Sequence, residues 1–405
     1  MTRPDRQSIN PQHSHSALEV LLVFLRLGLT SFGGPVAHLG YFRHEFVDKR
    51  RWLDAHAYAD LTSLCQFLPG PSSSQVGIAI GIARAGYAGA LAAWAGFTLP
   101  SALMLMMFAS QLNHFATATG AGILHGLKLV AVAIIAQAIW QMGRTLCPDR
   151  TRVGLAVLAA VVASFLPGSL TQAGIMLASA LAGMAFLKHP PPLPHLSLQS
   201  GLSWRSGLVA LGLLAGLLVL LPVASQLTHN HLIELIDRFF RAGSLVFGGG
   251  HVVLPLLQAA VVTPGWVSNT TFLAGYGAAQ AVPGPLFSFA VWLGATEQPA
   301  PTGWAGGMVC LLAIFLPAFL LIIGVLPFWE RLRNQTLARR AMMGVNAGVV
   351  GMLLAAFYQP VWTGSVHNGT DFGISLGLFL LLVVWQRPPW QIVALGSLAG
   401  LLIRF

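Results

Sequence analysis

A pair of motifs rich in glycine and proline occurs twice in this chain, and the repetition limits the folds available to it more than any other feature. Phe32-Gly33-Gly34-Pro35 corresponds to Phe247-Gly248-Gly249-Gly250, and Phe247 follows Phe32 by 215 positions. Gln66-Phe67-Leu68-Pro69-Gly70-Pro71 corresponds to Gln280-Ala281-Val282-Pro283-Gly284-Pro285, and Gln280 follows Gln66 by 214 positions. Because both motifs recur in the same order at nearly the same spacing, shared low complexity does not explain them. The chain therefore consists of two homologous halves.

Charged residues are too scarce for a soluble protein. They make up 8% of the 405 residues, hydrophobic residues make up 55%, and the mean hydropathy is +0.72, whereas about a quarter of the residues of a soluble protein are charged. Apolar stretches long enough to cross a bilayer alternate with short loops. The sequence therefore predicts an all-α integral membrane protein in a lipid bilayer. The formal net charge of +10 lies mainly in the short loops, where basic residues report topology, so no nucleic acid partner is expected.

The distribution of basic residues between corresponding loops gives the orientation of each half. The loop at residues 43–51 holds four basic residues, whereas the corresponding segment 251–271 holds none. In the opposite sense, residues 112–121 hold none, whereas the corresponding segment 331–340 holds four. Since loops rich in Lys and Arg stay in the cytoplasm, the halves are predicted to be inverted-topology repeats, with the N-terminus cytoplasmic.

These observations divide the chain into four parts. They are a disordered cytoplasmic tail (1–16), a first repeat (17–188), a Pro-rich linker with one extra transmembrane helix (189–230), and a second, inverted repeat (231–405). The apolar segments around the motifs are too short for two full crossings of about 20 residues each. We therefore expect broken, re-entrant helical hairpins at 18–47, 57–83, 232–262 and 272–296. The alternative treats each limb as a thin full span, which gives about thirteen spans instead of about nine plus four hairpins.

The motifs at membrane depth predict an anion site. Proline is tolerated at the first helical position, so Pro35, Pro71 and Pro285 are expected to begin half-helices whose N-termini point into the membrane interior. Free N–H groups and the positive end of the helix dipole favour anions, and inverted-repeat transporters bind substrate where broken helices meet near the midplane. Ser72 and Ser73, in the first turn after Pro71, can donate to oxyanion oxygens. Alternatively, the glycines and prolines serve only close packing or a kink.

Two arginines occupy matching positions in apolar segments. Arg26 and Arg241 each lie six residues before the phenylalanine of their Phe-Gly-Gly motif. A guanidinium in a membrane segment needs a partner, and a tetrahedral dianion suits its fork of donors. The alternatives are pairing with a nearby carboxylate, Glu19 or Asp237, or snorkelling to an interface.

Other polar residues in apolar surroundings are candidates for substrate contact or for ion coupling. The substrate candidates are the two glutamines that begin the second motif, Gln66 and Gln280. The candidates for proton coupling are His38, Glu45, Asp60, Lys128 and His251. The alternatives are loop anchoring, internal hydrogen bonding and, for Lys128, snorkelling.

Enzyme signatures are missing from the sequence. It contains no Walker A, HExxH, nucleophile-elbow or nucleotide-binding GxGxxG motif. Its three cysteines, Cys65, Cys147 and Cys310, stand alone, so neither a disulfide framework nor a metal cluster is predicted. We therefore expect no enzymatic activity, no cofactor and no metal, and an ion gradient as the energy source unless a separate subunit supplies energy.

With these motifs the sequence resembles the chromate ion transporter family, in particular its long, two-domain members. The resemblance rests on Phe32–Pro35 followed by His38, on Gln66–Pro71, and on their counterparts Phe247–His251 and Gln280–Pro285, and it covers the chain after the first 16 residues. It implies a bacterial inner-membrane protein that exports chromate, driven by an ion gradient with H⁺ as the expected coupling ion. Some relatives are thought to handle sulfate or other oxyanions.

The second half departs from the first in two places. Gly250 stands where the first half has Pro35, and Ser288 stands alone where the first half has three serines at 72–74. The substrate is therefore expected to be held mainly by the first half. Chromate and sulfate match in charge and closely in size, so a hydrogen-bonding pocket discriminates weakly between them. A sulfate or other oxyanion permease and an anion channel stay open as alternatives, as do the transport direction, the stoichiometry and the oligomeric state, a homodimer included.

Overall fold

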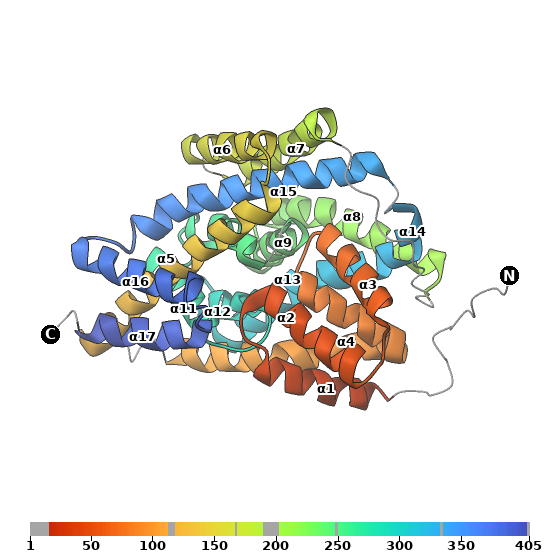
Figure 1. Ribbon diagram of the computed structural model, residues 1–405, viewed down its shortest axis with the longest axis horizontal. Helices are drawn as coiled ribbons and strands as arrows, with labels where there is room; N and C mark the ends of the chain where they lie inside the picture. Colours follow the sequence, from red (N-terminus) through yellow and green to blue (C-terminus); the bar gives the residue numbers. More distant parts are fainter. Residues whose placement is uncertain are drawn as a thin grey trace.

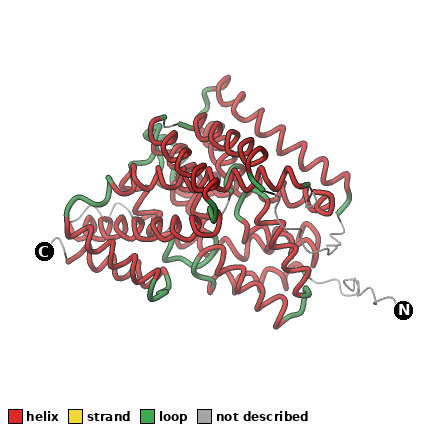
Figure 2. Tube along the Cα trace, turned by 45° about the horizontal axis from the view of Figure 1, so that its top comes forward, coloured by secondary structure: helices red, strands yellow, loops and turns green. Residues whose placement is uncertain are grey.

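The computed structural model describes residues 16–111, 118–166, 168–188, 202–247, 250–332 and 335–402, and within these ranges it contains helices and no strand (Figure 2). Within the described residues, five helices are long and apolar enough to cross a membrane: Ser72–Ser110, Gly120–Leu146, Trp204–Thr228, Gly303–Phe328 and Thr336–Trp362. The prediction of an all-α membrane protein is confirmed. Nearly all of the predicted tail (1–16) and residues 189–201 of the predicted linker lie outside the described residues, as do Gly248 and Gly249.

The first half consists of two broken hairpins followed by three further helices. Its elements are α1 (Ala17–Thr30), α2 (Gly34–Arg43), the π-helical η1 (His44–Lys49), α3 (Ala55–Phe67), α4 (Ser72–Ser110), α5 (Ala118–Leu146), α6 (Arg150–Phe165) and α7 (Ser169–Phe186). Between α1 and α2, Gly33 and Gly34 have φ values of +101° and +78°, which L side chains rarely adopt. Inside α4 the helical dihedrals are interrupted at Ala85 and Gly86. The residues before that kink form a half-helix, and those after it form a span.

A single helix, α8 (Trp204–Thr228), precedes the second half, which repeats the pattern of the first. Its elements are α9 (His231–Ser244), η3 (Gly250–Val252), α10 (Val253–Leu257), η4 (Gln258–Val262), α11 (Asn269–Ala279), η5 (Leu286–Ser288), α12 (Phe289–Thr296), α13 (Gly303–Val325), η6 (Leu326–Phe328), α14 (Trp329–Leu332), α15 (Thr336–Ala356), η7 (Phe357–Trp362), α16 (Gly369–Val383) and α17 (Pro389–Leu402). Side chains cap the helix starts, among them Ser16, Asp54 and Asn230. By sequence correspondence, α13 is the counterpart of the second limb of α4.

The two halves exchange helices with each other. α5 of the first half packs against α16 and α17 of the second, and α15 of the second half packs against α6 and α7 of the first (Figure 1). Within each half, α1 packs on α4 and α9 packs on α13 in the same way. The exchange is therefore reciprocal, and the two halves form one interlocked unit.

Glycines bring the exchanged helices into backbone contact. A Cβ added at Gly344 would lie 2.0 Å from the Ser179 carbonyl oxygen and 2.8 Å from the Gly183 Cα. At the corresponding contact, a Cβ on Gly126 would lie 2.1 Å from the Gly396 carbonyl oxygen. Small residues at such crossings allow the close approach on which membrane helix association relies.

Gly344→Ala is therefore expected to destabilise the protein by about 1–3 kcal/mol, because the methyl group forces α15 away from α7. The melting temperature in detergent measures the effect. The matched control is Gly216→Ala on α8, where nothing lies within 4 Å of the added Cβ. Equal melting temperatures for the two variants would show that the α7–α15 contact is not tight.

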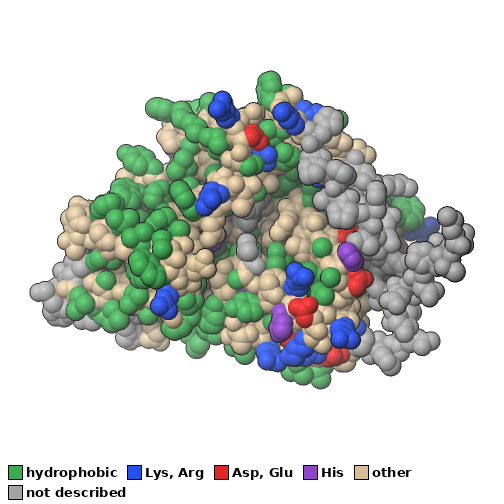
Figure 3. Space-filling model, in the orientation of Figure 1, with side chains coloured by type: hydrophobic (Ala, Val, Ile, Leu, Met, Phe, Trp, Pro, Cys, Tyr) green, Lys and Arg blue, Asp and Glu red, His purple; other side chains and the backbone are tan. Residues whose placement is uncertain are grey.

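Charge and apolar surface are separated on the outside of the molecule. Only Gly207 and Ala210 of α8 are buried, so this helix presents apolar side chains outward along most of its length. Charged side chains gather over α1 to α3, at the lower right of Figure 3, whereas the left of that view is mostly hydrophobic. This distribution is that of a multi-pass membrane protein.

Candidate functional site

The helix breaks of the two halves meet each other. The Gly70 N–H donates to the Val246 carbonyl at 2.6 Å, and the Gly284 N–H donates to the Ser31 carbonyl at 2.9 Å. Ser31 and Val246 occupy corresponding positions, directly before the two Phe-Gly-Gly motifs. Each Pro-Gly-Pro motif is therefore tied to the Phe-Gly-Gly motif of the other half. We call the region formed by the described residues 31–35, 69–71, 246–247, 250–251 and 283–285 the junction.

The junction is closely packed around two of its glycines. Gly284 has a φ of +107°, and a Cβ there would lie 2.9 Å from Ser101 Oγ and 3.1 Å from the Phe97 carbonyl oxygen. A Cβ on Gly250 would lie 3.3 Å from Pro35 Cγ. Pro35 and Gly250 correspond in sequence, so the two halves face each other there through equivalent residues.

The prolines lie at helix starts, each one residue away from the predicted first helical position. Pro35 is the second residue of α2, whereas Pro71 is the N-cap of α4 and Pro285 is the N-cap of the short η5 that precedes α12. No side chain caps α4, so its first amides, from Ser72 to Ser74, have no partner within the helix. This helix start is therefore a candidate N-terminal anion site.

Several buried polar side chains around the junction lack partners. The hydroxyls of Ser31, Ser74 and Thr98 have no hydrogen-bond partner in the described part of the chain. The same holds for Gln75 Oε1 and Gln280 Nε2. Leaving such groups unpaired is costly, so they are candidate contacts for a bound polar ligand or water.

Two of the predicted histidines are part of this region. His38 is buried, its Nδ1 lies 3.3 Å from Ser73 Oγ, and its ring packs edge-on against Phe97. His251 Nδ1 lies 2.7 Å from the Tyr276 hydroxyl, and its Nε2 lies 3.9 Å from the position of a Cβ on Gly34. The structure therefore brings both histidines to the junction.

A cavity of about 140 Å³ lies beside the junction and is lined by two arginines. Its lining includes Arg238 and Arg241 of α9, Leu245 next to the junction, and Gln172 of α7 from the other half. Arg241 pairs with the buried Asp237, but its Nε has no hydrogen-bond partner among the described residues. The cavity therefore offers guanidinium donors to an oxyanion. It lies beside the junction, because Leu245 in its lining directly precedes Val246.

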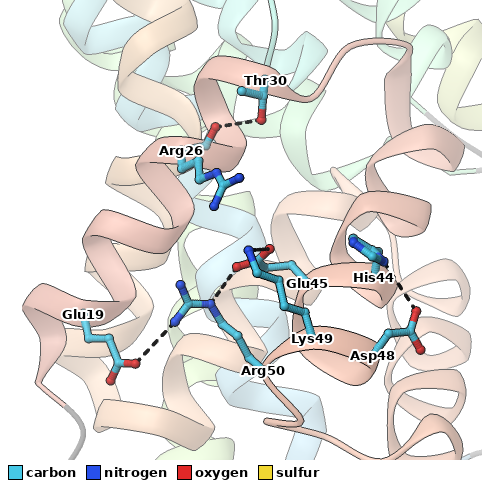
Figure 4. A network of polar contacts seen from close by, with 8 residues as sticks. All are labelled: Glu19, Arg26, Thr30, His44, Glu45, Asp48, Lys49 and Arg50. Carbon is cyan, nitrogen blue, oxygen red and sulfur yellow. Dashed lines mark hydrogen bonds and ion pairs between the residues drawn. The ribbon is translucent and has the colours of Figure 1, made fainter.

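The corresponding arginine of the first half lies in different surroundings. Arg26 is exposed on α1, and Figure 4 shows its side chain pointing toward Glu45 and Arg50 without an ion pair of its own. Glu45 is paired with Arg50 at 2.6 Å and with Lys49 at 3.3 Å, and Arg50 also lies 3.5 Å from Glu19. The predicted alternative of pairing with a carboxylate therefore holds for Arg241, which pairs with Asp237. The guanidinium of Arg26 has no carboxylate partner in the described structure.

Four of the other predicted residues lie outside the junction. Burial opposes ionisation of Glu45, but Arg50 and Lys49 outweigh it and hold the pKa of this carboxyl below its usual range, so it stays ionised at neutral pH. Asp60 accepts from Trp329 Nε1 at 3.2 Å, and Lys128 donates to the Gly364 carbonyl at 3.2 Å. Gln66 is exposed on α3.

One protein-family model, described as chromate transporter, matches residues 18–184 and again residues 233–401. The chain belongs to the chromate transporter family. A chromate transport protein of Pseudomonas aeruginosa is 29% identical over 398 residues, which cover 94% of this chain and 91% of that protein. A chromate transport protein of Cupriavidus metallidurans is 26% identical over 412 residues, which cover 97% and 95%. No solved structure matches the chain.

One relative is less than half as long as this chain. An uncharacterized transporter of Bacillus subtilis is 30% identical over 177 residues, which are 43% of this chain and 98% of that protein. Less than half of this chromate transporter family member thus corresponds to nearly all of a shorter transporter. This agrees with the duplication seen in the two motifs.

Sequence reasoning missed part of the polar lining. Ser31 and Gln75 stand next to the motifs, and a search for hydroxyl and amide side chains within one turn of each break would have found them, whereas Thr98 lies in the later part of α4. Gln172 reaches the cavity from the opposite half. His125 Nε2 lies 2.7 Å from Asp371 Oδ1 and joins α5 to α16, a pair that only the tertiary structure reveals.

Proposed function

We propose that this member of the family is a secondary active transporter that exports chromate across the bacterial inner membrane, driven by an ion gradient with H⁺ as the coupling ion. The observation that carries the proposal is the reciprocal meeting of four helix breaks around buried, unpartnered hydroxyls, beside an arginine-lined cavity. The names of the full-length relatives support chromate as the substrate.

The donor set suits a tetrahedral dianion. In this proposal chromate enters through the cavity, where the Arg241 guanidinium meets it, and then binds at the start of α4. There the amides of the first turn and the hydroxyls of Ser73 and Ser74 donate to its oxygens. A ligand that only accepts hydrogen bonds can pair with the unpaired hydroxyls, Gln280 Nε2 and Arg241 Nε, which favours an oxyanion over a cation or an apolar solute.

We further propose that the halves lie in opposite orientations, with the N-terminus in the cytoplasm. The reversed loop charges support this, and so does the single extra helix α8 between the halves, because one added crossing inverts a repeat that crosses an even number of times. In this arrangement Arg26 and Arg241 serve equivalent steps from opposite sides of the membrane. The reciprocal contacts of the junction fit such a two-fold relation.

Expression of the protein in chromate-sensitive bacterial cells is expected to lower chromate accumulation below that of vector controls. Collapse of the proton gradient is expected to abolish the difference, since no nucleotide-binding motif is present to supply energy. The measurement is cell-associated chromium with and without excess sulfate. Raised or unchanged accumulation would contradict export, and competition by sulfate would identify a broader oxyanion transporter.

A further inference from the structure

A carboxylate that the site above does not use is buried without a partner. Glu297 follows α12 directly, its side chain has no exposed surface, and neither carboxyl oxygen has a hydrogen-bond partner in the described structure. A charged carboxylate in such surroundings is strongly disfavoured, because nothing replaces its lost hydration. The protonated form of this carboxyl group is therefore favoured in this conformation.

His231 at the start of α9 is the nearest basic side chain. Its Nε2 lies 3.7 Å from Glu297 Oε2, beyond hydrogen-bond range, and this nitrogen also has no hydrogen-bond partner among the described residues. The other titratable or charged groups that face the pair are Glu234 and Arg238 on α9 and the Cys310 thiol on α13. The two side chains therefore lie about one small movement away from a hydrogen bond that would share a proton between them.

A single indole ring connects this pair to the cavity. The His231 ring packs edge-on against Trp266 with centroids 4.4 Å apart, and the Arg238 guanidinium lies 4.5 Å from the centroid of the same indole ring. Arg238 in turn lines the cavity. The residue after Glu297 is also tied to the indole residue, because the Gln298 N–H donates to the Trp266 carbonyl at 3.0 Å. The pair is therefore separated by one indole ring from an arginine that lines the cavity.

We propose that Glu297 and His231 form a proton-binding site that sets the affinity of the arginine-lined cavity for its oxyanion. The inference rests on the proposed function, since it takes the cavity as an oxyanion site. The proton on this pair is distinct from the coupling H⁺, because export driven by inward H⁺ requires H⁺ and substrate to bind alternately. A proton on the pair adds positive charge near a dianion, so protonation strengthens oxyanion binding and deprotonation weakens it. By linkage, a bound oxyanion strengthens proton binding to the same extent.

The pH range follows from the carboxyl group. Burial raises the pKa of Glu297 to about 8. The carboxyl is therefore protonated below that pH and loses its proton above it. Oxyanion affinity is expected to be high near neutral pH and to fall as the pH rises through this range.

The test is chromate binding to the purified full-length protein in detergent, measured as Kd between about pH 7.5 and about pH 9.5, where chromate remains a dianion. The wild-type Kd is expected to rise about fivefold or more over this range. The Kd of the Glu297→Gln variant is expected to change by less than about twofold over the same range. Asp48→Asn removes an exposed carboxylate and should follow the wild type. A Glu297→Gln protein that keeps the full pH dependence overturns the inference.

A second measurement uses only the wild type, so a variant that does not fold leaves the inference testable. Chromate added to weakly buffered protein near pH 8.5 is expected to cause proton uptake, by reciprocity of linkage. No proton uptake on binding overturns the proton site. No chromate binding at any pH overturns the proposed substrate instead, and with it the inference.

Discussion

Gly284→Ala is expected to lower the rate of chromate transport between about tenfold and about a hundredfold while the protein still inserts into the membrane. Residues with side chains are strained at the φ of +107° found here, which costs about 1–3 kcal/mol. The added Cβ would also lie 2.9 Å from Ser101 Oγ and 3.1 Å from the Phe97 carbonyl oxygen. Relief of that contact moves the junction and breaks the hydrogen bond from Gly284 to Ser31. Since about 1.4 kcal/mol corresponds to a factor of ten, a shift of this size depopulates the working geometry.

A matched variant separates backbone strain from packing at the junction. Gly86 also has a positive φ, +60°, but nothing lies within 4 Å of an added Cβ there. Gly86→Ala is therefore expected to show the modest effect of strain alone. Gly70→Ala, at the reciprocal contact, is expected to resemble Gly284→Ala, because Gly70 has a φ of +116° and the added Cβ would displace the Gln75 side chain, whose Nε2 lies 2.8 Å away. The measurement is chromate flux into proteoliposomes, normalised to inserted protein. Equal fluxes for Gly284→Ala and Gly86→Ala would show that the junction is not the transport path.

The breaks in the helices were predictable from the sequence because their cause is local. Gly33 and Gly34 take positive φ values, and Pro71 begins a helix, for reasons that belong to those residues alone. The hydropathy pattern likewise located α8 and the span after Gly86, since a bilayer demands long apolar segments. Local chemistry and the duplication therefore determine where the helices begin and end.

The direction in which side chains point was not predictable, because it depends on the opposite half. Gln66 belongs to the repeated motif and yet is exposed, whereas Gln75 lies nearby and bonds to the Pro69 carbonyl at 2.7 Å. Ala260 lines the cavity beside Arg241, whereas the corresponding position near Arg26 is Glu45. Equivalent positions thus acquired different neighbours as the halves diverged. Contacts such as that of His125 with Asp371 join residues far apart in the chain, and no local pattern encodes them.

Arg241→Gln is expected to reduce transport by about tenfold or more, because the cavity loses a charged fork of donors for the oxyanion. The same change leaves the Asp237 carboxylate, with 3% of its side chain exposed, without its partner. Breaking such a pair costs up to about 3–5 kcal/mol when both groups are buried, and less here because Arg241 is partly exposed. Loss of transport by this variant alone therefore has two explanations, a lost ligand contact and a damaged fold.

The double variant Arg241→Gln with Asp237→Asn distinguishes these explanations, because it removes both charges together. It is expected to recover the melting temperature of the wild type but not its transport, since the substrate contact is still missing. Arg26→Ala leaves no carboxylate unpaired and is expected to insert normally and lose transport as well, as the proposed equivalence of the two arginines requires. Arg205→Ala, an exposed arginine at the start of α8, serves as the control. Wild-type flux by the double variant would remove Arg241 from the path, and wild-type flux by Arg26→Ala would show that the two halves do not act equivalently.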